Sequence, residues 1–520
     1  MTLNDNTLYI RKKDEIFLEV LASDSIVNSL SDFFCFFVPG YKFMKKYKMK
    51  LWDGQIRLYN KHTGEIYLGL LQHIKEYARL HEYVIEYENG QDLDVEEEFS
   101  VKEALAFAKS LNIHVKREDK NEKDIFIPIE PHDFQLDAFR HSVQSSRSIL
   151  LCPTASGKSL IIYLLIRYYQ QFIKGKILII VPTVNLVSQM FTDFGEYSYA
   201  DKWDVRDETH MIYQGKEKGT KKQIVISTWE SIYKLPEEYF EQFEVIIGDE
   251  AHLFKAASLI KIMNKSMNAK YRFGTTGTLD GTKTHKLVLE GLFGRVYKVT
   301  TTKLLIEREI LSNILVNCLM LYYPEEICEK MKGAKYQQEI TFLVENEARN
   351  KFIRNLAISL KGNTLVLFNL VDRHGKILYE SIKNNVIDGR KVFFISGKVD
   401  AEIREKFRQI TEKERDAIIV ASYGTFSLGV NIRNLHNLII ASPIKSCIRL
   451  LQSIGRGLRK ASSKDILNFY DISDILQYKS HKNHTMKHFV IRMNIYNNEK
   501  FDYKLYKVRL KRPTHGLQSK

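Results

Sequence analysis

The sequence is poor in the residues that mark secreted, membrane-spanning and low-complexity proteins. Its 520 residues include only five cysteines and nine prolines. The cysteines lie far apart and form no CxxC pair, which argues against a disulfide framework and against a structural zinc site. No apolar run approaches the roughly 18 residues that a membrane helix requires, and no signal-peptide pattern is present. We therefore expect a cytoplasmic protein without a membrane partner.

Basic residues, in contrast, are in excess. The sequence has 78 Lys and Arg against 63 Asp and Glu, and the net charge of +15 favours an anionic partner such as a nucleic acid. Between positions 41 and 61, cations alternate with aromatic side chains and only one acid is present. The cations are Lys42, Lys45, Lys46, Lys48, Lys50, Arg57 and Lys61, and the aromatics are Tyr41, Phe43, Tyr47, Trp52 and Tyr59. We interpret this basic–aromatic segment as a DNA-binding surface. A solvated basic hairpin over an aromatic core stays open as the alternative.

From about residue 125, the hydrophobic pattern indicates an α/β protein. Short apolar runs without period-two alternation are separated by amphipathic stretches such as 160–172, which is typical of parallel sheets covered on both faces. The runs are 148–151, 176–181, 223–227, 244–247 and 271–274, and then 364–368, 391–395, 417–421 and 438–441. We predict four parts: a small α+β domain (1–110), two parallel-sheet domains (111–310 and 311–470) and a short basic C-terminal extension (471–520).

The strongest single motif is a phosphate-binding loop. It consists of Cys152, Pro153, Thr154, Ala155, Ser156, Gly157, Lys158 and Ser159, between an expected strand and an expected helix. Backbone N–H groups at the start of a helix bind phosphate. The lysine of such a loop reaches the β- and γ-phosphates, and the following hydroxyl binds Mg²⁺. Cys152 occupies the position of the usual first glycine.

A pair of carboxylates follows another apolar run. Residues 243–248 end in Asp249 and Glu250, and His252 follows two positions later. A carboxylate at the carboxyl end of a neighbouring strand is well placed to bind Mg²⁺, and a second one can act as general base toward water. We therefore predict Asp249 as a metal ligand and Glu250 as a catalytic residue.

These two motifs resemble those of the superfamily two nucleic-acid helicases and translocases of the DEAH type. The remaining motifs of that family follow in order over residues 130–460. The resemblance implies backbone contacts to DNA from Pro182, Thr183, Gln189, Thr228 and Thr425. It also implies coupling roles for His252, Thr276 and Thr278, ATP contact by Gly429, and catalytic roles for Gln452, Arg456 and Arg459. The fold it implies is two tandem RecA-like domains.

The residues themselves give a physical basis for the roles of the two arginines and for one further candidate, Gln135. Arg456 and Arg459 are about one helical turn apart, so they project from one face and are suited to stabilise the charge of a transferring phosphoryl group. Gln135 lies in a stretch, 131–135, that resembles an adenine-reading motif, since an amide can pair with the N6/N7 edge of adenine. The alternative, that Gln135 caps a helix, stays open.

Within the superfamily, the chain is most similar to the phage recombination helicases of the UvsW type. The resemblance implies an ATP- and Mg²⁺-dependent DNA helicase that acts on forks, Holliday junctions and R-loops in recombination, repair and replication restart. A single-stranded DNA-binding protein is a further candidate partner. Two alternatives remain open: an RNA helicase of the same superfamily, and an annealing or scaffold protein that uses ATP as a switch.

Overall fold

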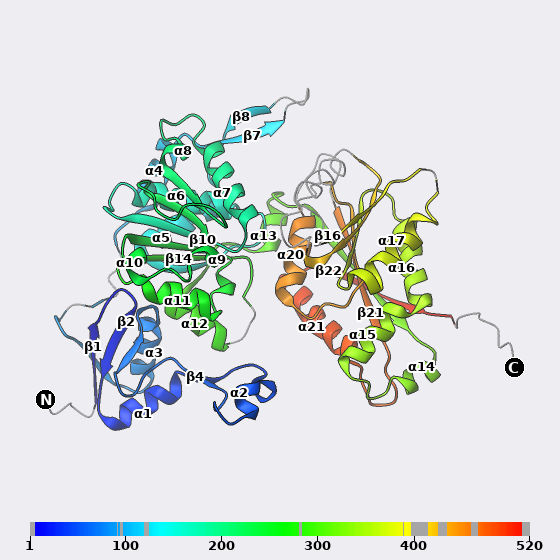
Figure 1. Ribbon diagram of the computed structural model, residues 1–520, viewed down its shortest axis with the longest axis horizontal. Helices are drawn as coiled ribbons and strands as arrows, with labels where there is room; N and C mark the ends of the chain where they lie inside the picture. The colour runs from blue at the N-terminus through cyan, green and yellow to red at the C-terminus, as the bar shows by residue number, and fades with distance from the viewer. Residues whose placement is uncertain are drawn as a thin grey trace. The chain divides into compact units, whose positions relative to one another are not determined.

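The computed structural model (Figure 1) describes residues 6–90, 92–93, 97–118, 124–279, 283–387, 389–396, 414–424, 434–458 and 466–511. The chain forms two compact units, of which the first ends at Thr300 and the second begins at Thr301. Each unit contains one seven-stranded sheet. This confirms the predicted α/β class with tandem parallel sheets. Across the described residues, every helix is too short or too polar to cross a lipid bilayer.

The chain begins with a small α+β layer within the first unit. Its sheet has the order β5-β2-β1-β6, with β1 parallel to β6 and antiparallel to β2. The strands are β1 (Thr7–Lys12), β2 (Phe17–Leu21), β5 (Glu65–Tyr67) and β6 (Val84–Tyr87), and the helices are α1 (Asp24–Phe33) and α3 (Leu71–Leu80). A hairpin of β3 (Cys35–Phe37) and β4 (Gln55–Arg57) carries the 3-10 turn η1 (Tyr41–Phe43) and α2 (Lys45–Lys48). The basic–aromatic segment therefore forms the outer part of this hairpin.

The larger sheet of the first unit is entirely parallel, with the order β11-β12-β10-β13-β14-β9-β15. Its central strands are buried except at Lys176 and Glu244, which are partly exposed, as the continuous apolar runs predict. The strands are β9 (Arg147–Leu151), β10 (Lys176–Val181), β11 (Thr209–Ile212), β12 (Ile224–Thr228), β13 (Phe243–Asp249), β14 (Tyr271–Thr276) and β15 (Val296–Lys298).

Helices connect these strands, and several begin with side-chain caps. The Ser100 hydroxyl accepts from the backbone N–H of Glu103 in a capping box, and Thr183 caps α7 in a similar way. The helices are α4 (Val101–Ser110), α5 (Asp133–Ser145), α6 (Lys158–Tyr169), α7 (Val184–Tyr197), α8 (Val205–Glu208), α9 (Trp229–Ile232), α10 (Glu237–Phe240), α11 (Ala257–Lys265) and α12 (Lys283–Phe293). A separate hairpin, β7 (His114–Glu118) with β8 (Asp124–Pro128), precedes α5, and the 3-10 turn η3 (Ala251–Leu253) follows β13.

The small N-terminal layer packs directly on the larger sheet of the first unit. One hydrophobic core runs through both and includes Leu70 and Ile74 of the small layer and Leu292 and Phe293 of α12. At Gly69 the two backbones approach so closely that a Cβ would collide with the carbonyl oxygen of Glu290. The His73 ring lies 3.0 Å from the carboxylate of Glu290, which is itself buried. The N-terminal layer is therefore a fixed part of the first unit.

The second unit repeats the parallel architecture, with the order β18-β19-β17-β20-β21-β16-β22. The strands are β16 (Asn313–Tyr322), β17 (Thr364–Phe368), β18 (Val392–Ile395), β19 (Ile418–Ser422), β20 (Asn437–Ile440), β21 (Ile466–Ile475) and β22 (Asp502–Arg509). The helices are α13 (Thr302–Glu307), α14 (Glu325–Lys330), α15 (Tyr336–Glu345), α16 (Glu347–Ser359), α17 (Lys376–Lys383), α20 (Cys447–Gly457) and α21 (His484–Glu499), and the π-helical turn η4 (Val371–Gly375) follows β17.

The end of the chain differs from the sequence expectation of a separate extension after residue 470. β21 continues to Ile475, and β22 pairs in parallel with β16 over eight residue pairs. Buried Asp471 on β21 binds the Arg492 guanidinium of α21 with two N–O distances of 2.8 Å. The described residues up to Lys511 are therefore part of the second unit, because an ion pair and a strand ladder hold them to its sheet (Figure 1).

Candidate functional site

The topology of the first large sheet brings five neighbouring parallel strands, β12, β10, β13, β14 and β9, to an end on the same side. The phosphate-binding loop follows β9, and Asp249 ends β13. Thr183 follows β10, Thr228 ends β12 and Thr276 ends β14. Because the carboxyl ends of parallel strands form one edge, residues from five separate motifs lie along the same edge of the sheet.

The phosphate-binding loop has the left-handed backbone that such loops need. Ala155 and Gly157 have φ angles of +65° and +78°, and α6 begins at Lys158. Residues with positive φ on either side of Ser156 turn backbone N–H groups toward one concave side, which suits an anion. The Ser156 hydroxyl is buried and, within the described residues, has no hydrogen-bond partner. Cys152 is buried as well, and burial raises the pKa of its thiol to about 12, so the side chain is an inert apolar filler.

Gln135 holds this loop from α5. Its Nε2 donates to the carbonyl of Ser156 at 2.8 Å, and its Oε1 accepts from the backbone N–H of His132 at 2.8 Å. Any Cβ at Gly157 would collide with the same Nε2 atom. The helix-capping alternative for Gln135 is therefore present, and both ends of the amide serve the protein itself. Adenine contact by Gln135 stays a prediction.

Lys158 and the two carboxylates form a tight electrostatic cluster. The ammonium Nζ lies 3.1 Å from Glu250 Oε1 and 3.9 Å from Asp249 Oδ1. Burial opposes ionisation of Glu250, but Lys158 and His252 outweigh it and hold the Glu250 pKa well below its usual range. Burial raises the pKa of Asp249, since Lys158 is farther from it and Glu250 repels its charge. Lys158 therefore favours the ionised form of Glu250, whereas burial and the charge of Glu250 oppose ionisation of Asp249.

Asp249 is well arranged to bind a hard cation. The Thr275 hydroxyl and the backbone N–H of Glu250 donate to Oδ1 at 2.8 and 2.9 Å, while Oδ2 has no hydrogen bond in the part of the chain that is described. No cluster of three His, Cys, Asp or Glu side chains suited to a metal occurs among the described residues. A single carboxylate nevertheless fits Mg²⁺, which in nucleotide sites is held by one or two carboxylates together with phosphates. Sequence reasoning missed Thr275, although it directly precedes the predicted Thr276.

The three predicted coupling residues are joined by hydrogen bonds. The Thr276 hydroxyl donates to the Thr278 carbonyl at 3.0 Å, and it lies 3.0 Å from His252 Nδ1. Because the hydroxyl has one proton, His252 must donate from Nδ1 to Thr276. The same Nδ1 lies 3.3 Å from Glu250 Oε2, which has no hydrogen-bond partner among the described residues. Hydrogen bonds thus join His252 through Thr276 to Thr278, and Glu250 lies beside His252 at the start of this series.

Three predicted DNA contacts lie at the same edge of the sheet, and a fourth, Gln189, lies on the helix that begins there. Val181 and Thr228 are register partners on β10 and β12, so Pro182, Thr183 and Thr228 are close neighbours. Thr183 caps α7 and Gln189 lies on its exposed side. Thr228 is buried and its hydroxyl lies 2.8 Å from that of Ser231, so its side chain is occupied. A DNA contact at Thr228 would come from the backbone.

Some predicted residues are not described. Thr425, Gly429 and Arg459 lie outside the described residues. Gln452 and Arg456 belong to α20, but their side chains are outside the description. The roles of these five residues stay predictions.

The basic–aromatic segment exposes its cations and part of its apolar surface. Lys45, Lys46 and Lys48 are exposed and, within the described residues, form no ion pair, whereas Arg57 pairs with Asp53. Phe43, Met49 and Leu51 are 82%, 67% and 71% exposed. Such exposed apolar side chains beside unpaired cations are typical of a binding surface.

The aromatics of this segment divide between structural and exposed positions. Tyr59 is buried and donates to the Val20 carbonyl at 2.9 Å, so the expectation that it stacks on bases is wrong. Tyr41 packs against Phe37 and Tyr47 with ring centroids 4.8 Å apart. The Trp52 indole N–H donates to the Gln55 carbonyl at 2.8 Å, which fixes its ring. Phe43 is left as the most exposed aromatic of the segment.

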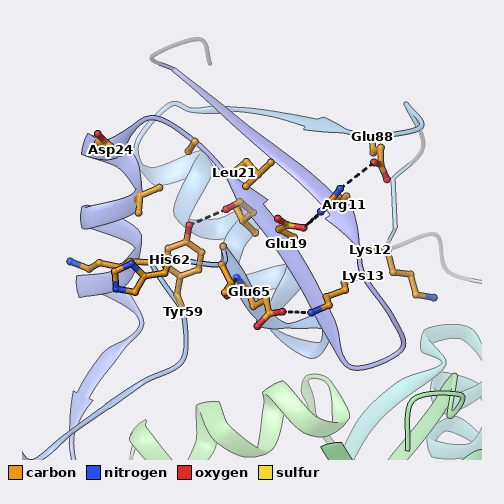
Figure 2. Close-up of a pocket in the computed structure, with 16 residues that line it drawn as sticks. Arg11, Lys12, Lys13, Glu19, Leu21, Asp24, Tyr59, His62, Glu65 and Glu88 are labelled. Atoms are coloured by element: carbon orange, nitrogen blue, oxygen red, sulfur yellow. Dashed lines mark hydrogen bonds and ion pairs between the residues drawn. The ribbon is translucent and has the colours of Figure 1, made fainter. Parts of the chain in front are cut away.

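A cavity of about 720 Å³ on the same N-terminal layer has a different character (Figure 2). Its charged side chains pair with one another: Arg11 with Glu19 and Glu88, and Lys13 with Glu65. Pairing leaves little net charge for an anionic ligand. Of the two features, the basic–aromatic segment is therefore the better candidate for DNA.

Comparisons with known proteins agree with this geometry. Residues 8–88 match the family model described as DNA helicase UvsW, N-terminal, and residues 128–281 match that of the type III restriction enzyme, res subunit. The ATP-dependent DNA helicase UvsW of Enterobacteria phage T4 is 36% identical over 504 residues, which are 94% of this chain and 96% of that protein. A DNA 3′–5′ translocase of Sulfurisphaera tokodaii is 23% identical over 380 residues, 65% of this chain and 81% of its own.

Solved structures show the same relationship. The crystal structure of T4 UvsW matches with a TM-score of 0.51 and 33% identity, over 97% of this chain and 100% of that one. The DNA-bound restriction-modification enzyme LlaBIII matches with a TM-score of 0.54 over 76% of this chain and 32% of its own, but at 16% identity it shows the fold alone. Because a relative 36% identical spans nearly the whole sequence, the chain belongs to the UvsW family of ATP-dependent DNA helicases in superfamily two.

Proposed function

We propose that this helicase uses ATP and Mg²⁺ to remodel branched DNA, namely forks, Holliday junctions and R-loops, in recombination, repair and replication restart. The observation that supports this most directly is the cluster of Lys158, Asp249 and Glu250 at the carboxyl edge of the first large sheet. Four free cysteines in the described chain, Cys35, Cys152, Cys318 and Cys328, suit a reducing cytoplasm, which we propose as the location.

Within this proposal, each residue of the cluster has a distinct role. Phosphates entering the loop compete with Glu250 for the Lys158 ammonium, and Lys158 then neutralises their charge. Glu250, released from Lys158, orients the attacking water and accepts its proton. Ser159 and Asp249 would hold Mg²⁺, which supplies further neutralisation of the phosphate oxygens when bound. The contacts from Glu250 through His252 to Thr276 would transmit the change at Glu250 to the end of β14.

DNA would contact two surfaces of the first unit. Thr183 and the backbone near Thr228 would bind phosphates and would make no sequence-specific contacts with bases. The basic–aromatic segment would bind a second part of the DNA near the branch, with Lys45, Lys46 and Lys48 on phosphates and Phe43 on an unpaired base. Because the N-terminal layer is fixed on the first unit, this second contact would move together with the ATP site. A single-stranded DNA-binding protein is a further proposed partner.

ATPase and strand-displacement assays test the proposal. We expect forked and four-way DNA to stimulate hydrolysis more than single strands, linear duplex or RNA. Strand displacement should require hydrolysis and be absent with a nonhydrolysable ATP analogue and in Lys158→Ala. Equal or stronger stimulation by RNA would favour an RNA helicase. Displacement supported by the analogue would favour an annealing protein that uses ATP as a switch.

A further inference from the structure

The edge strand β22 of the second sheet is unusually exposed to solvent. β22 pairs with β16 on one side and forms the edge of the sheet on the other. Every residue from Asp502 to Lys507 is exposed, so neither face of this part of the strand is covered by a helix. Edge strands in parallel α/β sheets are normally short or covered, since an open edge and two solvated faces stabilise the fold poorly.

The side chains on β22 combine cations with exposed rings. Residues 502–511 contain one acid, Asp502, and four cations: Lys504, Lys507, Arg509 and Lys511. None of these cations forms an ion pair with a described carboxylate, in contrast to the paired cations of the N-terminal cavity. Tyr503, Leu505 and Tyr506 are 36%, 53% and 42% exposed.

A third aromatic residue extends the surface onto the adjoining strands. Asn317 on β16 is the register partner of both Tyr470 on β21 and Lys504 on β22, so these three side chains share one face of the sheet. Tyr506 lies two residues farther along β22 on the same face. Tyr470 is half-buried, and burial together with nearby Tyr506 raises its pKa. Tyr470, Lys504 and Tyr506 therefore lie on one face of the sheet, and Tyr503, Leu505 and Lys507 lie on the other.

Protection of an edge against aggregation would explain the lysines but not the rings. Lys and Arg alone suffice to blunt an edge strand, and exposed Tyr and Leu work against that purpose. A single strand of nucleic acid uses both kinds of side chain, because bases stack on aromatic rings and phosphates need cations. We propose that β22, with Tyr470 beside it, binds a single strand of DNA. This contact lies on the second unit and is independent of the basic–aromatic segment.

Binding of a fluorescent single-stranded oligothymidylate to the full chain, measured over a salt series, tests the inference. Tyr506→Ala should weaken binding at least about fivefold, because a lost stacking contact is worth about 1 kcal/mol or more. Lys504→Ala should reduce the slope of log K against log salt by about 0.7, since each phosphate contact on a single strand contributes about 0.7. Thermal melting checks that both variants fold.

A matched control removes the same charge elsewhere on the second unit. Lys376 pairs with Asp372, so Lys376→Ala on α17 should leave affinity and salt slope unchanged. Photocrosslinking with 5-bromodeoxyuridine DNA should label the peptide containing residues 502–511. If the salt curves of the variants overlay that of wild type and no crosslink forms, the proposal is wrong. β22 is then an edge strand that its lysines protect against aggregation. Loss of binding to a labelled oligoglutamate peptide, with DNA binding unaffected, would overturn the proposal in favour of an acidic protein partner.

Discussion

The ammonium of Lys158 lies 3.1 Å from the carboxylate of Glu250, so the phosphate-binding lysine and the proposed general base neutralise each other directly. The same lysine is 3.9 Å from Asp249. An arriving phosphate must therefore compete with a carboxylate for Lys158, and that competition frees Glu250 when substrate arrives.

Replacing Lys158 by Ala should reduce ATP hydrolysis at least about a hundredfold, the usual effect of removing one preorganised electrostatic contact. DNA binding should change little, because the proposed DNA contacts lie on other elements. ATPase assays and DNA-binding titrations measure the two effects separately. Lys174→Ala is the control, because this exposed lysine lies beyond the far end of α6, at the opposite edge of the sheet from the loop. Activity of Lys158→Ala within a few-fold of wild type would exclude the phosphate-loop assignment.

Glu250→Gln should retain Mg²⁺-dependent ATP binding but hydrolyse ATP at least about a hundredfold more slowly, since the amide cannot accept a proton. Asp249→Asn is the contrasting variant, and it should lose the Mg²⁺ dependence of ATP binding. Nucleotide titrations with and without Mg²⁺, followed by single-turnover assays, distinguish the two. The roles are wrongly assigned if Glu250→Gln fails to bind nucleotide while any bound ATP turns over normally.

Gln135→Ala separates the two roles considered for this amide. The hydrogen bond to the Ser156 carbonyl predicts that the variant loosens the phosphate loop and weakens ATP and GTP binding alike. Recognition of adenine by Gln135 instead predicts a loss for ATP alone, because an adenine-specific pair is broken. Competition binding of both nucleotides to wild type and variant measures the ratio. An unchanged affinity for both would show that neither role matters.

Lys45→Ala/Lys46→Ala/Lys48→Ala should weaken binding to forked DNA and reduce its salt slope by about 2.7, since each duplex phosphate contact contributes about 0.9. A control with the same loss of charge is Lys12→Ala/Lys13→Ala/Lys75→Ala, because these lysines are already paired with Glu15, Glu65 and Asp92. Anisotropy titrations over a salt series compare the two. Equal salt slopes in both triple variants would assign the basic–aromatic segment to a solvated face.

His374 makes the second unit less stable at mildly acidic pH. It is fully buried between Ser442 and Asn350, and burial together with Arg349 lowers its pKa to about 3. The unfolded chain therefore binds one more proton than the folded chain between about pH 3 and the ordinary pKa of about 6.5, and stability falls as pH falls through that range. Between pH 6.5 and 5 the loss should be about 2 kcal/mol.

His374→Gln should remove this share of the pH dependence, because the amide can bond Ser442 and Asn350 without titrating. Hydrogen-exchange protection of β17 and β20 in the full chain, compared at pH 6.5 and 5, measures it. His488, whose pKa burial lowers to about 4, leaves a remaining pH dependence in the variant. Identical losses of protection in wild type and His374→Gln would contradict the prediction.

Local sequence patterns determined nine of the fourteen strands in the two large sheets, the phosphate loop and the Asp249–Glu250 pair, whereas β11, β15, β16, β21 and β22 were not predicted. Each of the predicted features depends on a contiguous stretch: an apolar run gives a buried strand, and a Gly-Lys-Ser turn between strand and helix gives a phosphate site. The family resemblance rested on the same contiguous motifs. For that reason the architecture and the ATP site could be predicted before any contact was known.

Only the tertiary structure decided how distant residues pair. The Gln135 contact with the loop, the Thr275 contact with Asp249 and the burial of Tyr59 each join residues from separate elements. β22 lies within the stretch that was expected to be a basic extension. It nevertheless pairs with β16, a strand almost two hundred residues earlier in the chain. Strand order depends on crossovers and on non-local packing, and composition contains no signal for it.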